Sequence, residues 1–308
     1  MDVLNDILDT LNLKGVLYFR TDLSSPWAVK VPDLEQAARF HLVIQGNCHV
    51  QFSSGVSVDL QPGDLVLIPK GRSHILSDGT TQQAPALETL LNTVGYDGNG
   101  VLVVGDGAPN ATTQMVCGHF NFRSGSDHPL LRALPEYLLT PASVRARQPW
   151  LDEVLRLITR RIFSDEAGSA TAVTRLSEIV FIELLRHGIG ESSALRAILE
   201  AFQDRYISRS LQLIHSQPEQ PWTVESLASE VCMSRSRFAD RFKTLLGSGP
   251  MSYLSDWRLQ KALALLDDAH CSVKQIASQT GYQSPAAFTR AFSGRFGISP
   301  TEYRRKLG

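Results

Sequence analysis

The chain has 308 residues, of which 43% are hydrophobic and 20% charged, an ordinary composition for a soluble globular protein. This length is sufficient for two domains, each with its own core. No apolar run is long enough to span a bilayer, and the first residues lack the pattern of a signal peptide. We therefore expect a cytoplasmic protein with no membrane partner. The cysteines are too scattered for a disulfide framework: Cys48, Cys117, Cys232 and Cys271.

The net charge of −1 is divided unevenly along the chain. Residues 205–308 carry 14 Lys and Arg against 8 Asp and Glu, whereas residues 1–204 carry 16 against 23. The basic segment can approach phosphate, and the acidic segment would be repelled by it. A charge of this size does not establish nucleic-acid binding by itself. Sequence motifs are needed to support that function.

Residues 15–125 are predicted to be rich in β-structure, because short apolar runs alternate with turn residues. Turns are expected at Gly46, Ser53–Gly55 and Pro62–Asp64. Many short strands at this spacing predict a barrel or a sandwich. The predicted strands include 41–44, 49–52, 56–60 and 65–69.

From about residue 128 the apolar spacing becomes helical. One helix is predicted around Trp150–Ile162, a second around Val173–Leu185, and a short third helix from Leu195. We expect this block to pack on the barrel, on a second subunit, or on both. His128 and His187 are assigned no function, because isolated histidines lie more often at the surface or at helix ends.

The last hundred residues repeat at an offset of 50 residues. Each copy reads as helix, tight turn and helix, and a helix through Trp257 and Leu266 joins the two copies. The second helix of copy one is predicted to bury Phe238, Phe242 and Leu245. Matched pairs include Ser234 with Ser284, Phe238 with Phe288, Phe242 with Phe292, Gly247 with Gly297, Pro250 with Pro300, and Tyr253 with Tyr303.

A helix that follows a tight turn can enter the major groove of DNA, where its first residues reach the base edges. Two such units can read consecutive major-groove segments about 34 Å apart. A helical bundle that binds no DNA would also explain a duplicated core. The exposed positions in copy one are Arg235, Ser236, Arg237, Ala239, Asp240 and Lys243, and those in copy two are Pro285, Ala286, Ala287, Thr289 and Arg290.

Residues 205–308 resemble the DNA-binding domain of the AraC/XylS family of transcription regulators. The resemblance rests on residues 281–292, on 296–304 and on the linker-helix residues Arg258, Ala262, Leu265 and Leu266. It implies binding to double-stranded DNA, contact with RNA polymerase, and activation rather than repression. Copy one departs from the family pattern at Cys232, where glycine is usual. The implied base-facing positions are Ser236, Ala239, Asp240, Pro285, Ala286, Ala287 and Arg290.

One motif in the barrel segment is specific: Gly63, five residues, Pro69-Lys70-Gly71, two residues and His74. It matches the second motif of the cupins, although Asp78 replaces the usual closing Asn. The first cupin motif does not supply its usual metal ligands, because Arg39 stands at the Glu position and no His-x-His lies upstream. This argues against a cupin oxygenase, so we expect no enzyme.

Arg39 and His41 alternate to one face of a strand, as do Cys117 and His119. His41, His74, Cys117 and His119 are ligand types that zinc and iron accept, so a non-standard metal site is one hypothesis. The alternative is that these side chains line a ligand pocket or are hydrogen-bonded polar residues of the core.

The first half as a whole resembles the cupin-type sensor domains fused to AraC-family modules. The predicted division is a cupin-like barrel over 1–125, a helical dimerisation segment over 126–203, and an all-α domain with two helix-turn-helix units over 204–308. The resemblance implies a small-molecule effector and a homodimer formed near residues 150–190. A cupin metalloenzyme and a regulator controlled by a protein partner stay open as alternatives.

Overall fold

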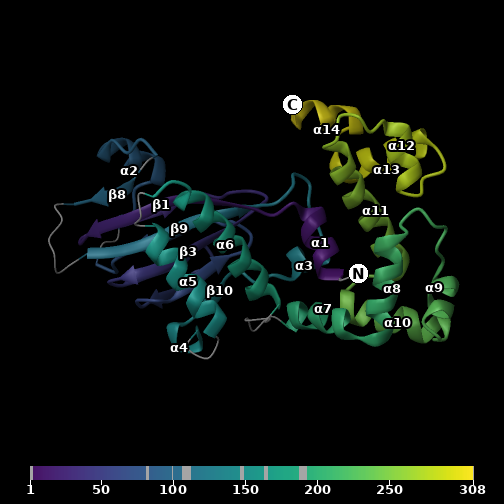
Figure 1. Ribbon diagram of the computed structural model, residues 1–308, viewed down its shortest axis with the longest axis horizontal. Helices are drawn as coiled ribbons and strands as arrows, with labels where there is room; N and C mark the ends of the chain where they lie inside the picture. The colour runs from purple at the N-terminus through teal and green to yellow at the C-terminus, as the bar shows by residue number, and fades with distance from the viewer. Residues whose placement is uncertain are drawn as a thin grey trace. The chain divides into compact units, whose positions relative to one another are not determined.

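The computed structural model describes residues 3–80, 83–98, 100–105, 112–145, 149–162, 166–186 and 193–307. The chain divides into two compact units (Figure 1). The sheet unit comprises Lys14–Asn121 and Leu134–Glu191, and the helical unit comprises Met1–Leu13, Phe122–Ala133 and Ser192–Gly308. No helix among the described residues is long and apolar enough to cross a membrane.

Two sheets form the sheet unit, as the short predicted strands indicated. All strand pairs are antiparallel except β1 with β8. The six-stranded sheet has the order β10 (Leu138–Thr140), β6 (Leu65–Ile68), β3 (Ala37–Gln45), β9 (Thr112–Asn121), β1 (Lys14–Ser24) and β8 (Val101–Val104). The four-stranded sheet has the order β2 (Ala28–Val31), β7 (His74–Ser77), β4 (Cys48–Phe52) and β5 (Ser57–Leu60).

The six-stranded sheet is covered on both faces, which explains why β3 is buried almost throughout. Helices α5 (Pro149–Ile162) and α6 (Ser169–Arg186) cover its outer face (Figure 1). Phe40 and Leu42 of β3 pack against these helices. The inner face of the six-stranded sheet shares a core with the second sheet, built around Val43, Val50 and Val66. Two of the three helices expected after residue 128 therefore pack on the sheets, as α5 and α6, whereas the third, expected from Leu195, belongs to the helical unit. The unit also contains α2 (Leu87–Val94) and α4 (Ala142–Arg145).

The helical unit contains the duplicated architecture that the repeat predicted. The first copy is α9 (Val224–Glu230) and α10 (Arg235–Leu246), the second is α12 (Val273–Gln279) and α13 (Pro285–Phe296), and α11 (Pro250–Leu266) joins them. Both second helices end at a left-handed glycine with φ of 74°, Gly247 and Gly297. The remaining helices are α1 (Val3–Leu11), α3 (Pro129–Ala133), α7 (Ser193–Gln203), α8 (Arg205–Ser216) and α14 (Pro300–Leu307).

The units differ from the contiguous division predicted from the sequence. Residues 1–13 and 122–133, which that division assigned to the barrel and the dimerisation segment, belong to the helical unit. Helix α1 buries Val3, Ile7 and Leu11 and packs against α8 and α11. Its amphipathic face therefore completes the core of the helical unit.

Two smaller expectations are also corrected. In α10 the third buried residue is Leu246, whereas the predicted Leu245 is only half-buried, because positions i, i+4 and i+8 face the core. His128 was expected at the surface or at a helix end, but its exposed fraction is 3% and both its ring nitrogens are hydrogen-bonded. His187 lies outside the described residues.

Candidate ligand cavity and nucleic-acid interface

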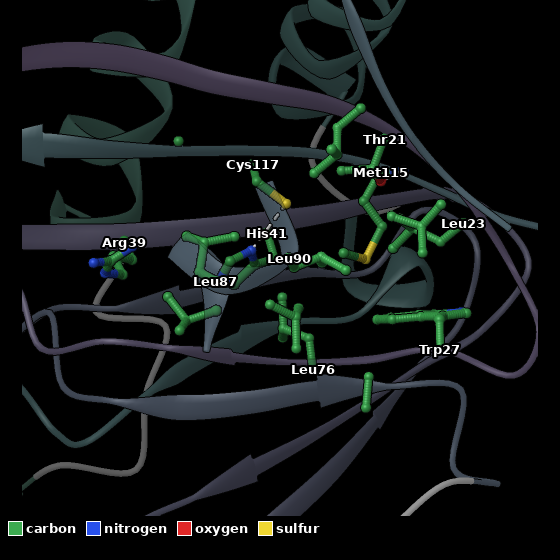
Figure 2. A pocket seen from close by; sticks show the side chains of 16 residues that line it. Thr21, Leu23, Trp27, Arg39, His41, Leu76, Leu87, Leu90, Met115 and Cys117 are labelled. Carbon is green, nitrogen blue, oxygen red and sulfur yellow. Dashed lines mark hydrogen bonds between the residues drawn. The ribbon is translucent and has the colours of Figure 1, made fainter. Parts of the chain in front are cut away.

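A cavity lies inside the sheet unit, with walls drawn from both sheets and from α2 (Figure 2). The space open to the centre of a water molecule is about 40 Å³, which is room for a few waters or a small apolar group. One end of the lining is polar and carries Arg39, His41 and Cys117. The apolar lining consists of Leu23, Trp27, Ala28, Val29, Val31, Leu76, Leu87, Leu90, Leu102, Val104 and Met115.

Helix α2 covers the cavity with Leu87 and Leu90, which are half-buried. None of the described residues of this helix is fully buried. The cavity wall formed by α2 is thus held by fewer buried contacts than the strands opposite, which makes α2 the part of the wall that can yield most readily to a larger molecule.

A chain of buried hydrogen bonds forms the polar end. Cys117 Sγ lies 3.1 Å from His41 Nδ1, as the dashed line in Figure 2 marks. His41 Nε2 lies 2.9 Å from His74 Nε2, and His74 Nδ1 lies 2.8 Å from the carbonyl oxygen of Arg72. Strand pairing explains the first contact, because His41 and Cys117 are register partners on β3 and β9.

The carbonyl at the end of this chain fixes every proton in it. Because a carbonyl only accepts, His74 donates through Nδ1, and Nε2 of the same neutral ring is an acceptor. His41 then donates from Nε2 to His74, so its Nδ1 accepts from the Cys117 thiol. In this neutral state each ring nitrogen between Cys117 and Arg72 has a partner.

Burial favours these neutral forms. Desolvation lowers the pKa of His41 well below its ordinary value, and the charge of Arg39 adds to this effect. Desolvation likewise lowers the pKa of His74 to about 4 and raises that of the Cys117 thiol far above its usual range. A thiol held in the protonated form is a poor nucleophile, so Cys117 is chemically quiet in this state.

Arg39 and His119 stand opposite each other in the register of β3 and β9. Arg39 is 5% exposed and donates from Nη2 to the carbonyl oxygen of Pro32 over 3.0 Å. Burial lowers the pKa of His119 to about 4, with a further contribution from the charge of Arg39. The five residues predicted at this site are thus all buried, and three of them line the cavity.

The geometry does not fit the predicted zinc or iron site. His41 turns Nε2 toward His74 and Nδ1 toward Cys117, so a single ion cannot bind both Nε2 of His41 and the thiolate. The Arg39 cation beside them also disfavours a second positive charge. Across the described parts of the chain, no group of three or more His, Cys, Asp or Glu is arranged to hold a metal.

The cupin-like motif has a structural role beside the cavity. Gly71 has a φ of 59°, and a Cβ there would collide with the backbone of Leu34. Asp78, which replaces the usual Asn, accepts from the backbone N–H of Trp27 over 3.2 Å and from the Ser25 hydroxyl. The motif therefore places His74 in the hydrogen-bonded chain and Trp27 in the cavity wall.

Sequence reasoning missed most of the apolar wall. Trp27 was noticed only within a family resemblance, although its side chain is 4% exposed and lines the cavity. Its indole N–H is buried with no hydrogen-bond partner among the described residues. A buried donor without an acceptor is costly, so this group favours a ligand that carries an acceptor.

The second surface of interest is formed by α10 and α13. Thr223 and Ser272 cap the first helix of each copy through capping boxes with Ser226 and Gln275. Ser284 caps α13 by accepting from the N–H of Ala287. Ser234 stands at the corresponding position before α10, but its side chain makes no capping bond.

The residues predicted to face DNA lie on these two helices. Arg235, Ser236, Arg237, Asp240 and Lys243 are exposed on α10. On α13, Pro285, Ala286 and Arg290 are exposed. The smaller positions Ala239, Ala287 and Thr289 are half-buried.

The arginines of this surface are not equivalent. Arg235 Nε lies 2.7 Å from a carboxylate oxygen of Glu225, which partly neutralises it. Arg295, on the last turn of α13, is paired with Asp127 and faces Asp256 at 3.9 Å. Arg290 forms no ion pair with any residue that the structure describes, and its exposed position on α13 leaves it accessible to a base edge or a phosphate.

Comparisons with known proteins agree with this architecture. A family model described as a cupin matches residues 2–190, and one described as a helix-turn-helix domain matches residues 227–306. The chain is 30% identical to the HTH-type transcriptional regulator AlkR of Acinetobacter baylyi, over 99% of this chain and 100% of that protein. It is 28% identical to an uncharacterized HTH-type transcriptional regulator of Haemophilus influenzae, over 100% and 99%. It is 25% identical to the HTH-type transcriptional regulator MtrA of Neisseria gonorrhoeae, also over 100% and 99%.

Proposed function

Because the chain belongs to the AraC-type family of DNA-binding transcription regulators that carry an N-terminal cupin domain, we propose that a small molecule in its cavity controls its binding to DNA. The proposed effector is largely apolar and carries one hydrogen-bond acceptor. The proposal includes activation through RNA polymerase, a homodimer and a cytoplasmic location. It assigns no enzymatic activity to the chain.

The apolar cavity with a buried, unpartnered indole N–H carries this proposal. Apolar walls reward the burial of hydrocarbon at about 25 cal/mol per Å². Trp27 Nε1 needs an acceptor that the described residues do not supply. A barrel packed solid would instead have favoured control by a protein partner.

The chemistry of the polar end supports binding rather than catalysis. The His41, His74 and Cys117 groups are neutral and bonded to one another, so none is poised as a general base or a nucleophile. Among the residues that the structure describes, no set of metal ligands is assembled around them. A ligand would contact a fixed polar end and an apolar wall whose α2 portion can move. This combination suits the binding of a small molecule.

Matched probes test the class of effector. Hexane and 2-hexanone have the same chain length, and only the ketone carries an acceptor. We expect 2-hexanone to raise the melting temperature of the full chain more than hexane does, and Trp27→Phe to abolish that difference while it preserves the response to hexane. If hydrocarbons and ketones up to eight carbons leave both the melting temperature and the affinity for DNA unchanged, the cavity is not an effector site.

A cavity-filling variant separates binding from folding. Val104 lines the cavity from the edge strand β8 and is half-buried, so Val104→Trp fills space with little strain on the core. The filled variant should bind DNA in the absence of ligand like the wild type and should lose the response to ligand. A response that survives the filling would place the effector elsewhere.

A further inference from the structure

We propose that residues 122–133, here called the strap, position the two helix-turn-helix copies relative to each other and so set the spacing of the DNA segments that the protein reads. The strap directly follows β9 and includes α3. It lies within the helical unit. The proposal rests on the DNA binding of the family and not on the identity or existence of an effector.

The strap is fastened to the middle of α11 by one buried amide. Gln260 is 3% exposed, and its Oε1 accepts from the N–H of Asp127 over 3.3 Å. Its Nε2 donates to the carbonyl oxygen of Gly125 over 3.3 Å. Gly125 has a φ of 80°, and a Cβ there would lie 3.3 Å from Leu263 and 3.4 Å from Phe296. The backbone of the strap thus packs closely on the helix that joins the two copies.

The strap also contacts the second copy directly. The hydroxyl of Tyr303, on α14, donates to the carbonyl oxygen of Ser124 over 2.9 Å. Arg123 forms an ion pair with Asp267 immediately after α11. Asp127 forms an ion pair with Arg295 on α13, the helix predicted to enter the major groove. These contacts tie the strap to α13 of the second copy and to the segments on either side of that copy, the end of α11 and α14.

The next residue of the strap reaches the first copy. His128 Nε2 lies 3.0 Å from the hydroxyl of Tyr253, and Tyr253 packs edge-on against Phe242 of α10 with ring centroids 5.6 Å apart. Asp127 and His128 are neighbours in sequence. One bonds to α13, and the other reaches α10 through a single buried tyrosine.

The protons of this buried contact are fixed as well. His128 Nδ1 accepts from the N–H of Leu130, so Nε2 donates to Tyr253. The Tyr253 hydroxyl then donates to Nε2 of His215, 2.8 Å away on α8. His215 Nδ1 faces Asp6 of α1 at 3.6 Å. Tyr253, on α11, therefore contacts the strap, α8 and α10, and its position depends on all three.

Charge reinforces the outer side of the strap. Arg132 of α3 lies 3.3 Å from Asp127 and 3.9 Å from Asp256 of α11, and Arg295 completes the group. Two acids and two arginines thus alternate across the strap and the two helices. Each pair is partly exposed and contributes little alone, whereas a network of four fixes an orientation more strongly.

The test measures how strongly the affinity of the full-length protein depends on the spacing between the two DNA segments. The probe is a duplex that the wild-type chain selects from a random-sequence pool, together with two altered forms. One form has the segment read by the second copy scrambled, and the other has one base pair inserted between the segments. The variants are Asp127→Asn, which loosens the outer network, and Gln260→Met, which removes the buried amide.

Both variants should bind the selected duplex about 2- to 5-fold more weakly and discriminate less against the inserted base pair. Their affinity for the scrambled duplex should equal that of the wild type. The loss cannot come from net charge, because removing an acid near DNA would strengthen binding. The matched control is Asp59→Asn, which removes the 2.7 Å contact with Nδ1 of His49 at the surface of the sheet unit and should change nothing.

Equal weakening on the selected and scrambled duplexes would overturn the proposal, because it would indicate a general loss of folded protein. Unchanged discrimination against the inserted base pair would overturn it too. Gln260 is buried, so its variant can fail to fold. The Asp127→Asn variant, at a half-buried position, is then sufficient on its own, with thermal unfolding as the check that it is folded.

Discussion

Cys232 occupies in the first helix-turn-helix copy the place that Gly281 occupies in the second, and both residues are left-handed. The φ angle is 55° at Cys232 and 75° at Gly281. The sequence marked this position, since Cys232 stands where glycine is usual in the family. The turn is thus conserved in shape, and the first copy holds a side chain where the backbone disfavours one.

Cys232→Gly should therefore stabilise the helical unit by about 0.5–1 kcal/mol, because relief of left-handed strain outweighs the added flexibility of glycine in the unfolded chain. Urea denaturation of the full chain measures this change. The control is Cys232→Ser, which removes the thiol and keeps the strain. Stabilisation by serine as large as that by glycine would show that the thiol, and not the backbone, is responsible.

Arg290→Ala and Arg235→Ala should weaken DNA binding unequally. Arg290 is exposed on α13, so its loss should cost about 1–3 kcal/mol if it reads a base. Arg235 is paired with Glu225, so its replacement by alanine should reduce the affinity for DNA by less. Glu225→Gln should strengthen binding by releasing Arg235. Titrations at several salt concentrations distinguish the roles, because the loss of a phosphate contact lowers the salt slope and affects all sequences alike.

Acid should destabilise the sheet unit through its neutral histidines. The pKa of His74 is about 4 in the folded chain, and that of His41 is also far below its ordinary value. Unfolded histidine titrates near 6.5, so the unfolded chain binds more protons between about pH 6.5 and pH 4. The free energy of unfolding should fall through this window by roughly 1.4 kcal/mol per pH unit for each histidine.

Denaturation series at fixed pH values check this dependence. His74→Gln should reduce the slope, because one proton fewer is taken up on unfolding. A slope that is the same in the variant would assign the acid sensitivity to other groups, such as His128 in the helical unit, whose pKa burial also lowers.

Tyr253→Phe should destabilise the helical unit by about 1–3 kcal/mol, because it leaves two buried histidine nitrogens without partners. The ring packing against Phe242 is preserved, so the loss is attributable to the hydroxyl. Chemical denaturation gives the magnitude. Tyr206→Phe, at a half-buried tyrosine on α8, is the matched control and should have almost no effect.

Local patterns in the sequence predicted much of this protein. The strands followed from apolar runs between turns, and the two copies followed from the offset of 50 residues. The strap escaped prediction because it has no repeat and no periodic apolar face. Its key contact joins His128 to Tyr253 across 125 positions of sequence, and nothing local indicates that pairing.

The sequence predicted which residues form the polar end of the cavity, but not how they interact with one another. Alternation along β3 and β9 predicted a shared face for Arg39 and His41 and another for Cys117 and His119, and three of these four residues line the cavity. Residue types alone suggested metal ligands. The ring orientation of His41, which only three-dimensional structure supplies, turns the same residues into a closed chain of hydrogen bonds.

The helical unit is assembled from three separate stretches of the chain, and this affects how the protein can be dissected. A fragment that begins near residue 204 carries both helix-turn-helix copies but lacks α1 and residues 122–133. It would expose the face of α11 that holds Tyr253 and Trp257, both almost fully buried in the intact chain. Such a fragment should be more prone to aggregate. Grafting the last hundred residues onto another sensor would therefore transfer the DNA-reading helices without the parts that complete their core.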